Sequence, residues 1–153
     1  MSRFQAGVPF EPHHPTALAL WCSDGRFTRA VEELLESLGQ PRLDTMTFPG
    51  GPALLEMSSS SLASVDNARE AASFLIRAHD IKEVVLVAHE GCGYYRARYP
   101  YESSEAMQRR QLADLRSAAR WVSRSHAGVN ARCFFASVAT TPNGPRVTFS
   151  AVE

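Results

Sequence analysis

The sequence has no stretch that would cross a membrane and no excess of charge. No apolar run approaches the ~20 residues of a membrane-spanning helix, and residues 1–15 lack the basic start and continuous apolar segment of a signal peptide. Sixteen basic and sixteen acidic side chains cancel, which removes the general attraction to nucleic acid or anionic lipid. We therefore expect a cytoplasmic protein without a nucleic-acid or membrane partner.

Cysteine is also scarce. The three cysteines, Cys22, Cys92 and Cys133, are an odd number and too few for a disulfide framework. We therefore expect reduced thiols, which metal binding, catalysis or burial must explain. Cys133 lies inside the apolar sequence "CFF", which favours a small buried hydrophobic residue. Cys22 and Cys92 remain as candidates for chemistry.

Short apolar stretches predict the strands. Residues 16–22 and 83–89 are continuous apolar runs, typical of strands buried on both faces of a sheet. Residues 42–48 alternate well enough for another strand and end at the breaker sequence "PGGP". Residues 131–141 form a further candidate, which "PNGP" separates from "RVTFSAV". That last pair predicts a closing antiparallel hairpin.

Helical periodicity predicts three amphipathic helices between the strands. The first begins at residue 27 or 28 and ends before Gly39, the second covers 62–76, and the third runs from about 103 to 125. Strands that alternate with such helices predict an α/β class, a three-layer fold with a mainly parallel central β-sheet flanked by helices. A chain of 153 residues with 44% hydrophobic content fits one domain over residues 1–153.

Two polar stretches follow predicted strands of this sheet. Cys22, Asp24 and Arg26 come at the end of the first apolar run, and His89 and Cys92 come at the end of another. In open α/β sheets, ligands bind beyond the carboxyl ends of the strands. We therefore expect these two distant pieces of sequence to converge.

Cys22, His89 and Cys92 together offer two thiols and an imidazole. Zinc takes sulfur and nitrogen ligands at four tetrahedral positions, and three protein ligands with one position left over are typical of a catalytic site. Two thiolates and a neutral imidazole also cancel the charge of the ion, which makes such a site tolerable in a partly buried pocket. The pattern indicates zinc.

Water or the carboxylate of Asp24 could fill the fourth position. A guanidinium pairs with a carboxylate through two prongs, so an Asp24–Arg26 pair would hold the carboxylate off the metal and leave the site open. Taken singly, each motif has an ordinary structural interpretation, and an exposed Asp-x-Arg pair contributes only ~0–1 kcal/mol. The occurrence of both motifs at strand ends favours the metal site.

At these residues the sequence resembles the β-class carbonic anhydrases. Their C-x-D-x-R motif stands here as "CSDGR" (22–26) and their H-x-x-C-G motif as "HEGCG" (89–93), and the resemblance extends over most of the chain. It implies Cys22, His89 and Cys92 as zinc ligands, with Asp24 and Arg26 as the catalytic dyad. It further implies reversible hydration of carbon dioxide to bicarbonate by zinc-bound hydroxide, in a homodimer or a multiple of dimers.

The sequence departs from the family pattern in three places. Thr47 stands where an arginine is common, and Gly91 stands where an acidic residue or serine is frequent before the second cysteine. The segment before Cys22 is also shorter than the helical arm of many members. Zinc binding is compatible with all three departures, whereas the substrate depends on them more closely.

Three other functions stay open at this point. The same scaffold could hydrolyse a carbon dioxide analogue such as carbonyl sulfide or carbon disulfide, or it could be a noncatalytic zinc domain in which Asp24 closes the site. A thiol redox protein is less favoured, because H-x-x-C lacks the paired cysteines of C-x-x-C.

All four tyrosines lie within 93–101. This segment is either a packed loop or the wall of an interface or pocket.

Overall fold

The computed structural model describes residues 3–153. Five strands form one sheet in the order β2-β1-β3-β4-β5, in which only the last pair is antiparallel. The elements, in chain order, are β1 Ala17–Cys22, α1 Gly25–Ser37, β2 Asp44–Phe48, the 3-10 helix η1 Gly51–Leu55, α2 Leu62–Ala78, β3 Glu83–His89, α3 Gly93–Arg98, α4 Ser104–Ser125, β4 Asn130–Thr141 and β5 Gly144–Val152.

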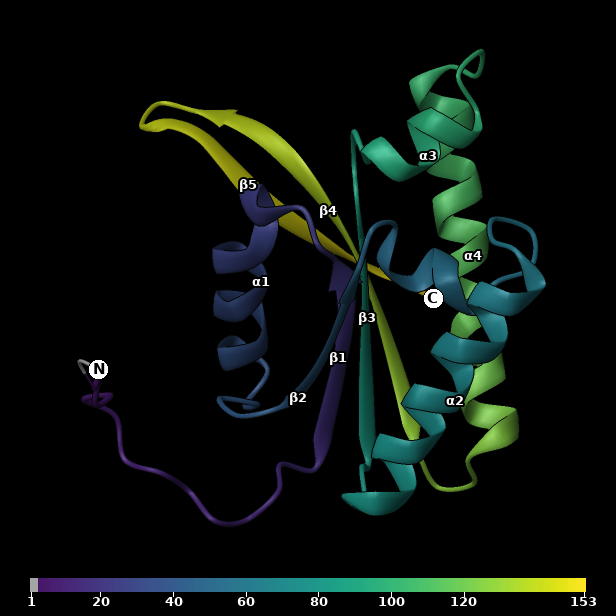
Figure 1. Cartoon of the computed structure of the whole chain (residues 1–153). Coiled ribbons are helices and arrows are strands. Elements are labelled where there is room, and N and C mark those ends of the chain that lie inside the picture. Colours follow the sequence, from purple (N-terminus) through teal and green to yellow (C-terminus); the bar gives the residue numbers. More distant parts are fainter. Residues whose placement is uncertain (1–2) are drawn as a thin grey trace.

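Helices cover both faces of this sheet (Figure 1). Helix α1 lies alone on one face, and η1, α2 and α4 lie on the other. Each face has its own core: Trp21, Val31 and Val87 belong to the one beneath α1, whereas Leu20 and Leu115 belong to the one beneath the other helices. This confirms the predicted three-layer α/β fold with a mainly parallel central sheet.

Strands β1 and β3 are the middle of the sheet. All six residues of β1 are buried, as are six of the seven residues of β3, because helices cover both sides of these parallel strands. The two strands pair in register from Ala17 with Glu83 to Trp21 with Val87. Their carboxyl ends, Cys22 and His89, therefore reach the same edge of the sheet.

Several element boundaries and one short helix differ from the sequence prediction, and α2 ends at Ala78, two residues later than predicted. Helix α1 begins at Gly25 instead of residue 27 or 28, because the side chain of Asp24 caps it. Strand β2 begins at Asp44, two residues later than predicted. Residues 93–98 form the short helix α3 within the tyrosine-rich segment.

The chain closes with an antiparallel hairpin, as predicted. Strands β4 and β5 pair from Cys133 with Val152 to Thr141 with Gly144, and the turn end of the hairpin extends beyond the rest of the sheet (Figure 1). Cys133 is buried against the main core, as its apolar neighbours indicate. Within residues 3–153, no helix has the length and apolar character needed to cross a membrane.

Candidate metal centre

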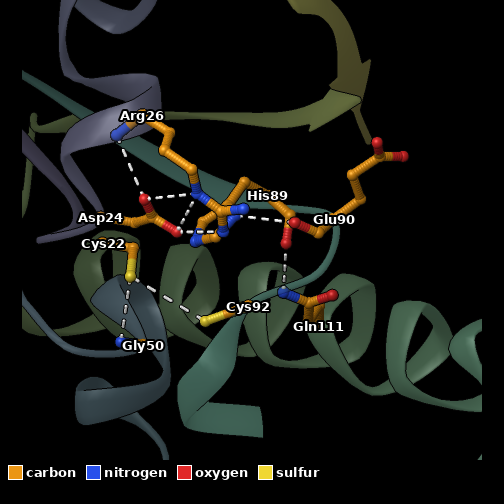
Figure 2. A network of polar contacts seen from close by, with 8 residues as sticks. All are labelled: Cys22, Asp24, Arg26, Gly50, His89, Glu90, Cys92 and Gln111. Atoms are coloured by element: carbon orange, nitrogen blue, oxygen red, sulfur yellow. Dashed lines mark hydrogen bonds and ion pairs between the residues drawn. The ribbon is translucent and has the colours of Figure 1, made fainter. Parts of the chain in front are cut away.

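The structure brings Cys22, His89 and Cys92 together at the carboxyl edge of the sheet. Cys22 ends β1, His89 ends β3, and Cys92 is the N-terminal cap residue of α3. All three are buried, and their potential ligand atoms all lie within 4.8 Å of one another. Figure 2 shows the three side chains directed toward a common point. Two distant stretches of sequence thus converge as expected.

The dimensions and the unpaired atoms of this cluster fit a metal ion. The two sulfur atoms lie 3.9 Å apart, close to the separation of about 3.8 Å that two thiolates have on a tetrahedral zinc. The buried Nε2 atom of His89 has no hydrogen-bond partner within residues 3–153, although such an atom normally has one. A metal at the cluster would satisfy this nitrogen.

The ring of His89 is held so that Nε2 faces the cysteines. Its Nδ1 atom lies 2.8 Å from the carbonyl oxygen of Glu90, which favours the tautomer with the proton on Nδ1 and a free lone pair on Nε2. The ring of Phe27 packs against the imidazole at 4.3 Å between centroids. The orientation suits a metal-binding histidine.

The two thiols differ in acidity because they contact each other. Contact with the Cys92 thiol lowers the pKa of Cys22, and this effect outweighs that of burial, which raises it. Contact with Cys22, together with burial, raises the pKa of Cys92. The contact therefore favours a single thiolate in the pair, and a thiolate is the form of cysteine that binds metal.

Backbone donors surround the Cys22 sulfur. The N–H group of Gly50 donates to it at 3.4 Å, and a backbone hydrogen bond from Asp24 contributes to the lowered pKa of the thiol. Gly50 has φ of 87° and lies so close to the ring of Tyr94 that a Cβ atom would come within 2.5 Å of it. Only glycine fits this position without a shift of the ring.

Asp24 and Arg26 form the pair that the sequence predicts. The Arg26 Nε atom donates to Oδ1 of Asp24 at 2.9 Å, and its terminal nitrogen donates to Oδ2 at 2.6 Å. Oδ1 also accepts from the backbone N–H of Arg26 at 3.1 Å. The guanidinium lowers the pKa of Asp24 to about 2. Figure 2 shows the Asp24 carboxylate turned toward Arg26.

Behind the cluster lies a polar network that the sequence analysis missed. Tyr94 and Tyr99 form hydrogen bonds with the serine segment 58–60, and Tyr95 donates to the buried Asp114. The tyrosines therefore form part of the wall behind the cysteines, whereas Tyr101 is fully exposed. The sequence does not show that Tyr95 pairs with Asp114, because the two residues are 19 positions apart and belong to different helices.

A cavity of about 120 Å³ adjoins Cys92 but neither Cys22 nor His89. Gly91, Cys92, Met107 and Gln111 are among the residues that line it. One water occupies about 30 Å³ of liquid volume, so this space admits a molecule of only a few heavy atoms. A larger hollow of about 480 Å³ lies between α1 and β2 and is lined by none of the three clustered residues.

The fold and the cluster are those of an α/β protein with a candidate metal centre at the carboxyl edge of a parallel sheet. The family is identified from the sequence. The model of the family described as putative carbonic anhydrase matches residues 13–141, and this chain belongs to that family. A search of curated proteins gives no match.

Solved structures show the same fold. Carbonic anhydrase from Streptococcus mutans aligns with a TM-score of 0.58 and 14% identity, over 96% of this chain and 88% of that one. The β-carbonic anhydrase isoform I of Trichomonas vaginalis aligns at 0.56 and 10% identity, over 93% and 86%. One of two tetrameric β-carbonic anhydrases from Sordaria macrospora aligns at 0.54 and 13% identity, over 90% and 81%. The fold is therefore that of the β-carbonic anhydrases.

Proposed function

We propose that this chain is a zinc lyase that hydrates carbon dioxide reversibly to bicarbonate and a proton. Cys22, His89 and Cys92 would hold the metal. The observation that carries the proposal is the paired Asp24 carboxylate beside a buried cluster of two thiols and an unsatisfied imidazole nitrogen. Zinc there would supply a Lewis acid that lowers the pKa of a coordinated water toward neutrality.

The remaining chemistry belongs to Asp24 and Arg26. With its pKa lowered to about 2, Asp24 is a carboxylate at neutral pH and accepts a hydrogen bond from the attacking water, which fixes the direction of the oxygen lone pairs. Arg26 occupies both carboxylate oxygens and keeps Asp24 from becoming a fourth ligand. This arrangement supports an open site over a noncatalytic one closed by Asp24.

The proposal extends to assembly and substrate. One structural neighbour is described as a tetrameric β-carbonic anhydrase, and we propose that this chain also forms a homodimer or a multiple of dimers. Carbon dioxide is proposed from the family alone, because the cavity of about 120 Å³ beside Cys92 is lined by neither Asp24 nor His89. Carbonyl sulfide is of similar size and needs the same chemistry, so it belongs in the same test.

The test combines metal analysis with stopped-flow hydration across pH. We expect about one zinc per chain, because the cluster has ligands for one ion, and loss of that zinc in Cys22→Ser. The control is Cys133→Ser, which removes a buried thiol outside the cluster and should keep the zinc. Fresh protein without bound metal would contradict the proposal.

The second variant is Asp24→Asn, which removes the charge of the carboxylate and leaves its size. We expect hydration to fall by about 10–100-fold, the usual cost of losing a group that orients a metal site, while the zinc content stays at the wild-type level. Wild-type turnover by this variant would refute the assigned role of Asp24. Turnover of carbonyl sulfide in preference to carbon dioxide would reassign the substrate.

A further inference from the structure

Helix α4 buries two polar side chains in its otherwise apolar face. Gln111 is 3% exposed and Asp114 is 4% exposed, and their spacing of three residues places them side by side on the helix. Burial of a polar group is unfavourable unless hydrogen bonds satisfy it. The partners of these two residues therefore show why the helix tolerates them.

Gln111 bonds the backbone of a candidate metal ligand. Its Nε2 atom donates to the carbonyl oxygen of His89 at 2.8 Å, and Figure 2 shows the amide reaching from α4 to the end of β3. His89 is the last residue of that strand, so the backbone pairing of β3 ends there. The imidazole ring must nevertheless keep a fixed orientation if it is to bind a metal. The amide of Gln111 fixes the peptide from which the imidazole projects.

Asp114 forms hydrogen bonds with residues that pack behind the two cysteines. Its Oδ1 atom accepts from Ser58 at 2.7 Å, and its Oδ2 atom accepts from Ser59 and from Tyr95, each at 2.5 Å. Burial raises the pKa of Tyr95, so its hydroxyl remains a donor. Tyr95 packs in the same buried group as both Cys22 and Cys92, three residues after Cys92 in the sequence.

We propose that Gln111 and Asp114 are positioning residues of the metal centre, which α4 uses to set His89 and Cys92 relative to each other. The proposal rests on the proposed metal function. Without one of these hydrogen bonds, the segment from His89 to Cys92 would keep its place at the end of β3. The nitrogen and sulfur donors would, however, no longer be held at a fixed separation. Groups that orient ligands in this way commonly change metal affinity by about 10–100-fold.

The test measures metal binding instead of turnover. Gln111→Leu fills the same space without the donor, and Gln108→Leu is the matched control, because Gln108 is an exposed glutamine one turn earlier on α4. Each protein is stripped of metal and titrated with Co²⁺, and its visible spectrum and affinity are recorded at a temperature at which circular dichroism shows it folded. We expect Gln111→Leu to lose about tenfold or more in affinity with an altered cobalt spectrum, and Gln108→Leu to match the wild type.

Asp114→Asn provides the second variant if Gln111→Leu does not fold. The amide keeps one acceptor oxygen for the three hydroxyl donors, so we expect an altered cobalt spectrum in a folded protein. Wild-type spectra and affinities in both variants would overturn the positioning role, whatever their melting temperatures. Wild-type protein that binds cobalt but does not hydrate carbon dioxide would overturn the proposed activity alone.

Discussion

At the scale of single residues, the cluster was predictable because its donors are rare residue types at strand ends. Cys22 and His89 each follow a strongly apolar run, so their convergence followed from the parallel sheet. Asp24 was predictable as a partner of Arg26, and the structure shows that pair with the expected two-pronged geometry. Its second contact, as the cap of α1, explains why the helix begins at Gly25 and earlier than the apolar spacing indicates.

Gly50 provides a residue-scale prediction about stability. Gly50→Ala should destabilise the protein by about 1–3 kcal/mol more than Gly39→Ala, because both positions have positive φ but only Gly50 has a ring against its missing Cβ. The Gly39 variant measures the backbone cost alone. Urea unfolding of the metal-free proteins checks the difference. Equal destabilisation would show that Tyr94 moves aside freely.

At the scale of elements, periodicity located the helices but missed what α4 buries. Apolar spacing predicted this helix over about 103–125, whereas the structure buries the polar residues Gln111 and Asp114 beside Leu115. Amphipathic patterns assign polar residues to solvent. A buried carboxylate becomes recognisable only when its donors are known, and Ser58, Ser59 and Tyr95 come from other elements. Helix α3 was missed for another reason, because its six residues are too few to show an apolar periodicity.

Glu56, at the carboxyl end of η1, gives a pH prediction. It is 6% exposed, the nearest guanidinium nitrogen of Arg69 lies 3.6 Å from it, and burial raises its pKa. An acid whose pKa is higher in the folded than in the unfolded state loses stability as pH rises from its unfolded value of about 4.3. We therefore expect wild type to lose stability relative to Glu56→Gln between pH 4 and pH 7.

Chemical unfolding of wild type and Glu56→Gln across that range measures the effect. The free energies of unfolding should diverge in favour of the glutamine variant as pH rises. Two curves that stay parallel from pH 4 to pH 7 would show that the folded structure tolerates the ionised carboxylate without cost.

At the scale of the whole molecule, the fold follows from the order of strands and helices, and the solved carbonic anhydrase from Streptococcus mutans shares it over 96% of this chain. That residues 1–153 form one domain stays a prediction, as does the cytoplasmic location. Assembly could not be derived from the sequence, because an interface depends on surfaces that an apolar pattern does not describe. Phe10 and Tyr101 are 88% and 100% exposed in the single chain, and a subunit interface would bury such side chains.

The oligomeric state is therefore the prediction at this scale. Sedimentation equilibrium at micromolar concentration should give the mass of two chains or a multiple of two. A dilution series separates a stable assembly from a weak one. The mass of one chain throughout the series would contradict the proposed homodimer.

The cap at the start of α1 ties the state of the proposed metal centre to a backbone amide. The Asp24 oxygen that pairs with Arg26 also accepts from the Arg26 N–H group, so a carboxylate that swung onto the metal would leave this amide without its acceptor. Loss of a cap costs about 1 kcal/mol, which disfavours the closed state by about fivefold. Closure would then appear as faster hydrogen exchange of the amides in the first turn of α1. This measurement reports whether Asp24 binds the metal and requires no substrate.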